Sequence, residues 1–358
     1  MKVAVLGVGL IGGSIGLAAR ARLDAEVTGF DPDRGLLDRA TELGAIDLAE
    51  DSVAAAVEGA EIVFCAAPVM ALPGLAAEAL HAAGEDCAVT DVGSVKRDVI
   101  AAIGSEERFI GGHPLAGAET SGVENAHADL FEGARWYLTP TSTTGGVLYD
   151  RVQRAIADIG ARPQAIEAET HDRLMATISH LPHVVANVLV TQAATALSEE
   201  AEHLPEVGPS FRDATRVAGA NPAIWGDIFS GNREAVAAEI DAAVARLSEA
   251  ADLIRSGERE AVTAWQEQAG NRRRELIEAE IAGGPLHELR VRVPNRPGIV
   301  AEIALELGRA GVNIEDMALY PAADMTSGAI SLYIAGDDEA GRAEQLVRAL
   351  GHDVSRAE

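Results

Sequence analysis

The stretch Lys-Val-Ala-Val-Leu-Gly-Val-Gly-Leu-Ile-Gly, at residues 2–12, decides the fold. A short run of β-forming residues leads into G-x-G-x-x-G, and an alanine-rich helical stretch follows. In this context Gly7 permits a tight turn, Gly9 lets the backbone approach a pyrophosphate, and Gly12 allows close packing of helix on strand. The stretch therefore predicts the first strand, turn and helix of a Rossmann domain.

The ligand expected at this turn is NAD. Backbone N–H groups at the start of the helix, at Leu10 and Ile11, would face the phosphates. Asp31 ends the next predicted strand, where a carboxylate accepts the ribose hydroxyls and repels a 2′-phosphate. Arg34 lies nearby and could weaken this preference over NADP. Pro68, at the end of a later strand, is expected beside the nicotinamide.

Strand and helix patterns alternate throughout residues 1–167. Amphipathic stretches rich in alanine and leucine separate several of the β-rich runs, which predicts a parallel sheet with helices on both faces. The β-rich runs are residues 2–6, 26–30, 62–66, 88–92, 109–112, 136–139 and 163–167.

Residues 168–282 have helical composition and lack strand signals. The stretch 181–198 is apolar nearly all round, so it must be buried in a large core or against another subunit. Polar residues such as His183 interrupt it, and we expect no membrane span. A helical domain that takes part in an oligomer is the expected arrangement.

Residues 286–358 follow the linker Gly283-Gly284-Pro285 and form a unit of their own. The order of its expected elements is β-α-β-β-α-β, which is the ferredoxin-like order.

The overall composition excludes several classes of function. The 358 residues carry a formal net charge of −27, which opposes binding to nucleic acid or to an anionic membrane surface. Only Cys65 and Cys87 are present, so a disulfide framework is excluded and a reducing cytoplasm is expected.

A candidate general base follows the strand at 109–112. His113, at the carboxyl end of that strand, would lie near the nicotinamide and could take a hydroxyl proton during hydride transfer. Ser94, after an earlier strand, could hydrogen-bond the same hydroxyl. For an isolated histidine the alternative is a structural role.

Two further groups of residues could bind a ligand. His180 and His183 have a spacing that could suit a metal, but no Cys, Asp or Glu completes a site, so no metal is expected. Arg212 and Arg216 could bind carboxylates through their guanidinium forks. For Arg212, pairing with Asp213 is the alternative.

Together these segments resemble the prephenate dehydrogenase family, which includes arogenate dehydrogenases. The resemblance covers residues 1–282 and implies a Rossmann domain, then a helical domain that forms an intertwined homodimer. It also implies NAD-dependent oxidative decarboxylation of prephenate to 4-hydroxyphenylpyruvate in tyrosine biosynthesis. The matching pieces, in order, are GVGLIGGS, DVGSVK, GGHPLAGAE, SHLPH, FRDATRVA and Trp225.

The resemblance further implies residue roles. His113 would take the proton from the ring hydroxyl, and Ser94 would orient that hydroxyl. Arg216 would bind the ring carboxylate. His183 and Arg212, the latter from the second subunit, would face the side-chain carboxylate. The residues expected at the entrance, wall or second layer of the pocket are Glu119, Ser179, His180 and Trp225.

Residues 287–358 resemble an ACT domain, an amino-acid-sensing module. The matching pieces are VPNRPG at 293–298 and GVNI at 311–314. The expected effector is tyrosine, and the alternative is a pure dimerisation module. The resemblance implies an effector site at Asn295, Arg296, Gly298, Asn313 and Ile314.

Of three competing functions, the sequence leaves the first open and argues against the other two. An arogenate dehydrogenase would form tyrosine directly, and Glu119 could then pair with the substrate ammonium. A β-hydroxyacid-type dehydrogenase usually has a catalytic lysine in its helical domain, but no lysine follows Lys96. A non-catalytic sensor of NAD and an amino acid would not need His113, Ser94 and Arg216 together.

Overall fold

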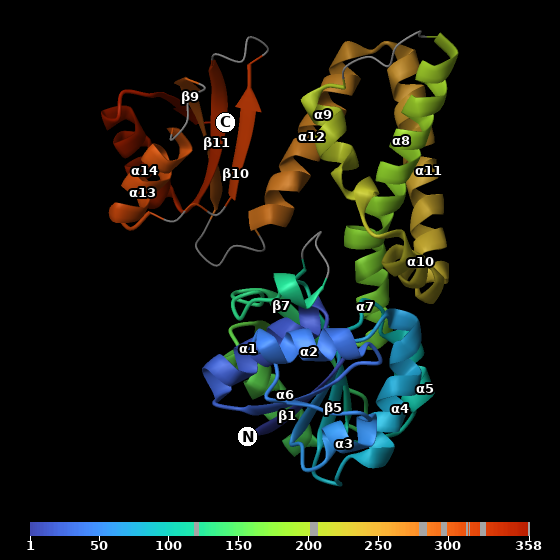
Figure 1. Ribbon diagram of the computed structural model, residues 1–358. Coiled ribbons are helices and arrows are strands. Elements are labelled where there is room, and N and C mark those ends of the chain that lie inside the picture. The colour runs from blue at the N-terminus through green and yellow to red at the C-terminus, as the bar shows by residue number, and fades with distance from the viewer. Residues whose placement is uncertain are drawn as a thin grey trace. The chain divides into compact units, whose positions relative to one another are not determined.

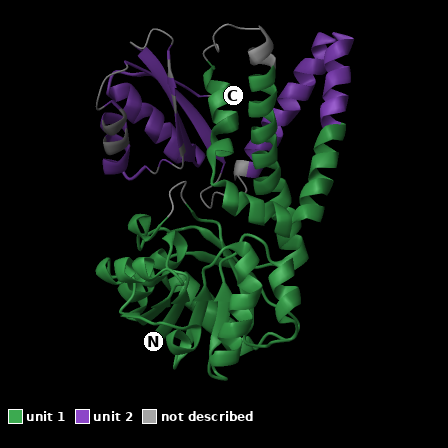
Figure 2. Cartoon of the chain, turned by 45° about the vertical axis from the view of Figure 1, so that its right-hand side comes forward, with its two compact units in different colours: residues 1–245 green, residues 246–358 purple. Residues whose placement is uncertain are grey.

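Figure 1 shows a computed structural model of the chain. It separates into two compact units, residues 1–245 and 246–358, which divide within helix α11 (Arg233–Ser256) (Figure 2). The domain boundaries expected at 167/168 and 282/286 stay a prediction. The structure describes residues 1–117, 122–200, 207–278, 285–294, 299–312, 314, 316–322 and 327–356.

The first unit contains an eight-stranded sheet with the strand order β3-β2-β1-β4-β5-β6-β7-β8. The expected parallel sheet is confirmed except at its far side, where β7 runs antiparallel to β6. Its strands are β1 (Lys2–Leu6), β2 (Glu26–Phe30), β3 (Leu48–Ala49), β4 (Ile62–Cys65), β5 (Ala88–Asp91), β6 (Phe109–Pro114), β7 (Arg135–Thr139) and β8 (Arg162–Ala165).

The direction of β7 follows from its connection. A parallel return needs a crossover, usually a helix. The described residues between β6 and β7 contain only a three-residue 3₁₀ turn, Val123–Asn125, so the chain returns antiparallel. Strand β3 was not expected, because two residues are too short for a recognisable β-rich run.

Helices cover both faces of the sheet, as expected (Figure 1). In β1, Val3 and Val5 point into one core cluster and Ala4 and Leu6 into the other. This alternation buries the strand on both faces. The helices are α1 (Leu10–Leu23), α2 (Arg34–Glu42), α3 (Val53–Val57), α4 (Leu72–Ala82), α5 (Arg97–Ile103) and α6 (Gly146–Asp158).

Every secondary-structure element described between Ala168 and residue 245 is helical, which confirms the expected change of class. A π-helical turn, Ala176–His180, joins α7 to α8 without a break. Such turns are frequent at functional sites. The other helices here are α7 (Ala168–Met175), α8 (Leu181–Glu200), α9 (Pro209–Thr215), the 3₁₀ turn Arg216–Gly219, α10 (Pro222–Gly231) and α11.

The continuous run Ala168–Thr195 is long and apolar enough to cross a membrane by length and composition alone. The apolar stretch 181–198 was expected as a separate helix, but it is continuous with α7. Only 22% of the apolar window is buried within the chain. Val188, at 56% exposed, is one of several apolar side chains of α8 that a further surface would have to cover.

The second unit contains the expected ferredoxin-like fold. Its antiparallel sheet has the order β10-β11-β9-β12. Leu289 and Val291 point into its core, whereas Arg290 and Arg292 point outward. The elements are α12 (Arg259–Glu278), β9 (Leu286–Pro294), α13 (Ile299–Arg309), β10 (Asp316–Pro321), β11 (Ser327–Ala335), α14 (Asp337–Ala349) and β12 (Asp353–Arg356).

Candidate active site

The glycine-rich turn after β1 is shaped by backbone packing. Gly7 has φ +98°, and a Cβ there would clash with the carbonyl oxygen of Ala66. A Cβ on Gly12 would clash with the carbonyl oxygen of Gly7. Gly9 differs, because a Cβ there would meet no atom within 4 Å. The turn therefore has no room for a side chain at Gly7 and Gly12, whereas Gly9 borders open space at the start of α1.

A carboxylate lies beside this turn. Asp31 Oδ2 accepts a hydrogen bond from Val8 N at 3.0 Å, and Oδ1 accepts one from Asp33 N at 2.9 Å. Arg34 forms ion pairs with Asp38 and Asp51, so its charge is already shared between two carboxylates.

The residues expected to hold a dinucleotide are thus brought to one edge of the sheet. Leu10 and Ile11 form the first turn of α1, directly after Gly9. Pro68 precedes a 3₁₀ turn after β4, the strand that pairs with β1. An open glycine, a helix N-terminus and a carboxylate after β2 fit the dinucleotide that the sequence predicts.

His113 lies at the carboxyl end of β6 and is 8% exposed. Its Nδ1 is 2.9 Å from Nε2 of His171, which belongs to α7. Burial holds the pKa of His113 well below its usual value, and His171, Lys96 and His180 lower it further. The imidazole is therefore neutral at pH 7, which is the form that a general base requires.

His171 is held in turn by Asp172. His171 Nδ1 lies 2.8 Å from Asp172 Oδ1. Asp172 also accepts hydrogen bonds from the backbone N–H groups of Lys96, at 2.8 Å, and Arg97, at 2.9 Å. Sequence reasoning missed His171 and Asp172, because nothing in their local pattern distinguishes them from other polar residues of an amphipathic helix.

A buried ion pair fixes the loop that carries Ser94. Lys96 pairs with Asp91, and both side chains are fully buried. Lys96 Nζ also donates to the carbonyl oxygen of Gly112 at 2.7 Å, directly before His113. Burial lowers the pKa of Lys96, and Asp91 opposes this shift. Ser94 is half-buried in this loop, and its side chain makes no hydrogen bond to His113 within the described chain.

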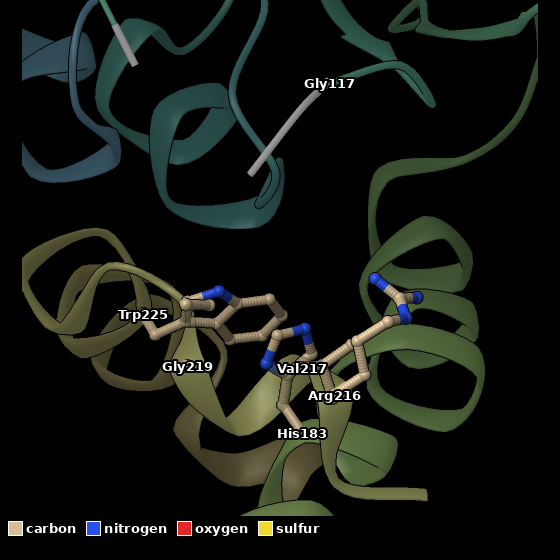
Figure 3. A pocket seen from close by; sticks show the side chains of 7 residues that line it. Gly117, His183, Arg216, Val217, Gly219 and Trp225 are labelled. Carbon is tan, nitrogen blue, oxygen red and sulfur yellow. The ribbon is translucent and has the colours of Figure 1, made fainter. Parts of the chain in front are cut away.

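A cavity of about 510 Å³ opens between the segment after β6 and the helices. Figure 3 shows the indole of Trp225 beside the imidazole of His183, with the Arg216 side chain next to them. The two rings stack, with centroids 3.3 Å apart and planes inclined by 24°. The lining residues are Gly117, His183, Arg216, Val217, Gly219, Ala220 and Trp225.

The histidines near this cavity are neutral at pH 7. Burial lowers the pKa of His183, and Arg216 lowers it further. Burial lowers the pKa of His180 to about 4. His180 packs edge-on against Trp225 with ring centroids 5.9 Å apart, and it interacts electrostatically with His113. His180 thus contacts the cavity wall and also interacts with the candidate base.

The structure does not bring every expected residue to the cavity. Arg212 is exposed on α9, donates to the carbonyl oxygen of Val207 at 3.0 Å and does not line the cavity. Ser179 is half-buried in the π-helical turn. Glu119 lies outside the described residues.

Most of the expected effector site also lies outside the described residues, namely Asn295, Arg296, Gly298 and Asn313. Ile314 is described and packs, partly buried, against the core of the second unit. Its role in effector binding stays a prediction.

Comparison with known proteins identifies the family. Residues 15–165 match the prephenate dehydrogenase nucleotide-binding domain, 167–268 the dimerization domain of the same family, and 287–352 the ACT domain. The chain is 31% identical to the prephenate dehydrogenase of Bacillus subtilis (strain 168), over 98% of this chain and 96% of the relative. The chain belongs to the prephenate dehydrogenase family. The resemblance seen in the sequence motifs is confirmed.

The chain is also similar to a further curated protein and to solved structures. The cyclohexadienyl dehydrogenase of Zymomonas mobilis is 34% identical over 71% of this chain and 88% of the relative. A crystal structure of the Aquifex aeolicus prephenate dehydrogenase, in complex with hydroxyphenyl propionate and NAD+, superposes with a TM-score of 0.72 at 33% identity, covering 77% of this chain and 98% of that one. Synechocystis arogenate dehydrogenase gives a TM-score of 0.67 at 25% identity, covering 77% and 100%.

Proposed function

We propose that this chain catalyses the NAD-dependent oxidative decarboxylation of prephenate to 4-hydroxyphenylpyruvate in tyrosine biosynthesis. The observation that carries the proposal is the cavity lined by Arg216, His183 and Trp225, because His180, which packs against Trp225, also interacts electrostatically with the buried, neutral His113. Prephenate carries one carboxylate on its ring and a second on its side chain, so it needs cationic groups, a flat apolar wall and a base. The Aquifex aeolicus relative is described with hydroxyphenyl propionate, an aromatic carboxylate of similar size.

The residues of the chain divide the chemistry between them. His113 accepts the proton of the ring hydroxyl as hydride leaves the same carbon. The Arg216 guanidinium holds the ring carboxylate through two parallel hydrogen bonds. Bound NAD supplies the hydride acceptor. Release of that carboxylate as carbon dioxide leaves an aromatic ring, and this makes the overall step effectively irreversible.

Asp31 and Arg34 support NAD over NADP. Asp31, held beside the glycine-rich turn, can accept the ribose hydroxyls and would repel a 2′-phosphate. Arg34, the nearby cation that could favour the phosphate, pairs with Asp38 and Asp51.

A homodimer would cover the exposed apolar side chains of α8, in line with the dimerization-domain match. Arg212 would then face the side-chain carboxylate of the substrate in the other subunit. The ACT match supports an amino-acid effector, and we propose tyrosine acting as a feedback inhibitor. We also propose that the protein acts in the cytoplasm.

Arogenate is the alternative substrate, favoured by the similarity to an arogenate dehydrogenase and a cyclohexadienyl dehydrogenase. The test is NADH formation by the purified protein with prephenate and arogenate in parallel, with NAD and NADP compared and tyrosine added afterwards. Faster turnover of prephenate with NAD, slowed by tyrosine, is the expected result. Binding of NAD without turnover of either substrate would refute the proposal and favour the sensor function.

A further inference from the structure

A buried row of hydrogen bonds leads from the candidate base away from the cavity. It runs from His113 on β6 through His171 to Asp172 on α7, and then to the backbone at the start of α5. We propose that His171 and Asp172 are positioning residues that fix His113 in the tautomer whose lone pair lies on Nε2. This inference rests on the proposed function, in which His113 takes the hydroxyl proton.

The direction of the hydrogen bonds follows from Asp172. A carboxylate can only accept, and its two oxygens already accept from Lys96 N and Arg97 N. His171 must therefore carry its proton on Nδ1 to make the 2.8 Å contact with Oδ1. In a neutral His171 the lone pair is then on Nε2, which accepts from His113 Nδ1–H at 2.9 Å. His113 is left with its lone pair on Nε2, ready to receive a proton.

The surroundings hold this arrangement in place. His171 is fully buried, and Asp172 is 3% exposed. The ring of Tyr137, on β7, packs edge-on against His171 with centroids 5.6 Å apart. Asn232 donates to the backbone carbonyl of Asp172 at 2.7 Å and lies 3.2 Å from His180 Nδ1. The His171 ring therefore cannot turn without breaking its buried contacts with His113, Asp172 and Tyr137.

The same arrangement stabilises the charge that appears during the reaction. When His113 takes up a proton, a cation forms in a buried site that already contains the Lys96 ammonium. His171 and Asp172 place a hydrogen-bond acceptor and then an anion behind that cation. In a water-excluded site, groups that are oriented beforehand act more strongly than they would in water.

The test replaces His171 by leucine, which fills the space without an acceptor, and by glutamine, whose amide oxygen can take the place of Nε2. Each protein is assayed as the full chain with saturating NAD, after thermal unfolding has shown that it folds. Positioning predicts a kcat about 10²-fold lower in His171→Leu, because this is the lower range for loss of a general base. KM should stay within about twofold, because Arg216 and His183 are untouched. His171→Gln should recover most of the loss.

A double-mutant cycle separates positioning from packing. In a His113→Asn background, the His171→Leu change should cost almost nothing further, because His171 acts through His113. Equal losses in the leucine and glutamine variants, or the same loss in the His113→Asn background, would overturn the proposal and show a structural role only. A kcat of His171→Leu within about threefold of the wild-type value would also overturn the proposal.

A spectroscopic measurement keeps this inference separate from the proposed function. In protein with ¹⁵N-labelled histidine, the imidazole nitrogen shifts of His113 and His171 should both report a proton on Nδ1, with NAD bound. A proton on His113 Nε2 would overturn the inference even if the enzyme turns over prephenate. Failure of the wild-type protein to turn over either substrate would instead refute the proposed function, and the tautomers would still decide the inference.

Discussion

Two glycines of the dinucleotide turn should respond oppositely to the same substitution. Gly7 has φ +98° and its missing Cβ would clash with the Ala66 carbonyl oxygen, whereas a Cβ on Gly9 would meet nothing within 4 Å. Alanine at Gly7 therefore strains the fold itself. Alanine at Gly9 leaves the free protein intact and occupies the space into which the pyrophosphate would come.

The magnitudes differ accordingly. A left-handed backbone costs a non-glycine residue about 1–2 kcal/mol, and overpacking adds about 1–3 kcal/mol. Gly7→Ala should thus lower the free energy of unfolding by about 2–5 kcal/mol and Tm by on the order of 10 °C. Gly9→Ala should change Tm much less than Gly7→Ala does, because Gly9 is in extended backbone with φ −71° and ψ −155° and a Cβ there meets no atom within 4 Å. Its Kd for NAD should rise by about tenfold or more, or roughly 1.4 kcal/mol.

Thermal unfolding and calorimetric titration with NAD measure the two effects separately. Gly7→Ala is the matched control, since it adds the same methyl group two residues away. Wild-type affinity for NAD in Gly9→Ala would refute the placement of the pyrophosphate at this turn. An unchanged Tm in Gly7→Ala would refute the claim that backbone packing requires glycine there.

Three further predictions follow from the site. Burial lowers the pKa of His180 from 6.5 to about 4, so the unfolded chain binds more protons between these pH values, and the free energy of unfolding should fall by up to about 3 kcal/mol as the pH drops from 6.5 to 4. In urea unfolding, His180→Gln should show a weaker pH dependence than the wild type, and an equal dependence would contradict this prediction. Arg216→Lys keeps the positive charge but loses the two parallel hydrogen bonds of the guanidinium group, so kcat/KM for prephenate should fall about 10- to 100-fold. The control is Arg154→Lys at an exposed position, and equal kinetics of the two variants would contradict the contact between Arg216 and the substrate carboxylate. Val188→Asp puts a carboxylate among the exposed apolar side chains of α8, so the molar mass measured by light scattering should shift toward that of the monomer. An unchanged dimer would show that the interface lies elsewhere.

Much of the fold could be read from local patterns. The glycine-rich turn after a β-rich run identified the first Rossmann unit, because its requirements lie within eleven consecutive residues. The β-α-β-β-α-β order of the second unit followed from alternation in strands such as Leu286–Pro294. Family motifs also named the residues that meet at the cavity, namely His183, Arg216 and Trp225.

The rest depended on contacts between segments far apart in the chain. The antiparallel direction of β7 depends on a connection without a crossover helix, and the sequence pattern of a strand carries no direction. The continuity of α7 with α8 depends on a π-helical turn that periodicity does not reveal.

The sequence by itself determined the class of each part and placed His113 at the end of a strand as the candidate base, because periodicity and glycine placement are local properties. Only the tertiary structure decided what surrounds that base. His113 and His171 are 58 residues apart in the chain and 2.9 Å apart in space, and Asp172 meets the start of α5 across 76 residues. Hydrogen bonds of this kind depend on how a helix packs against the end of a sheet. The two partners lie too far apart in the chain for a local sequence pattern to relate them.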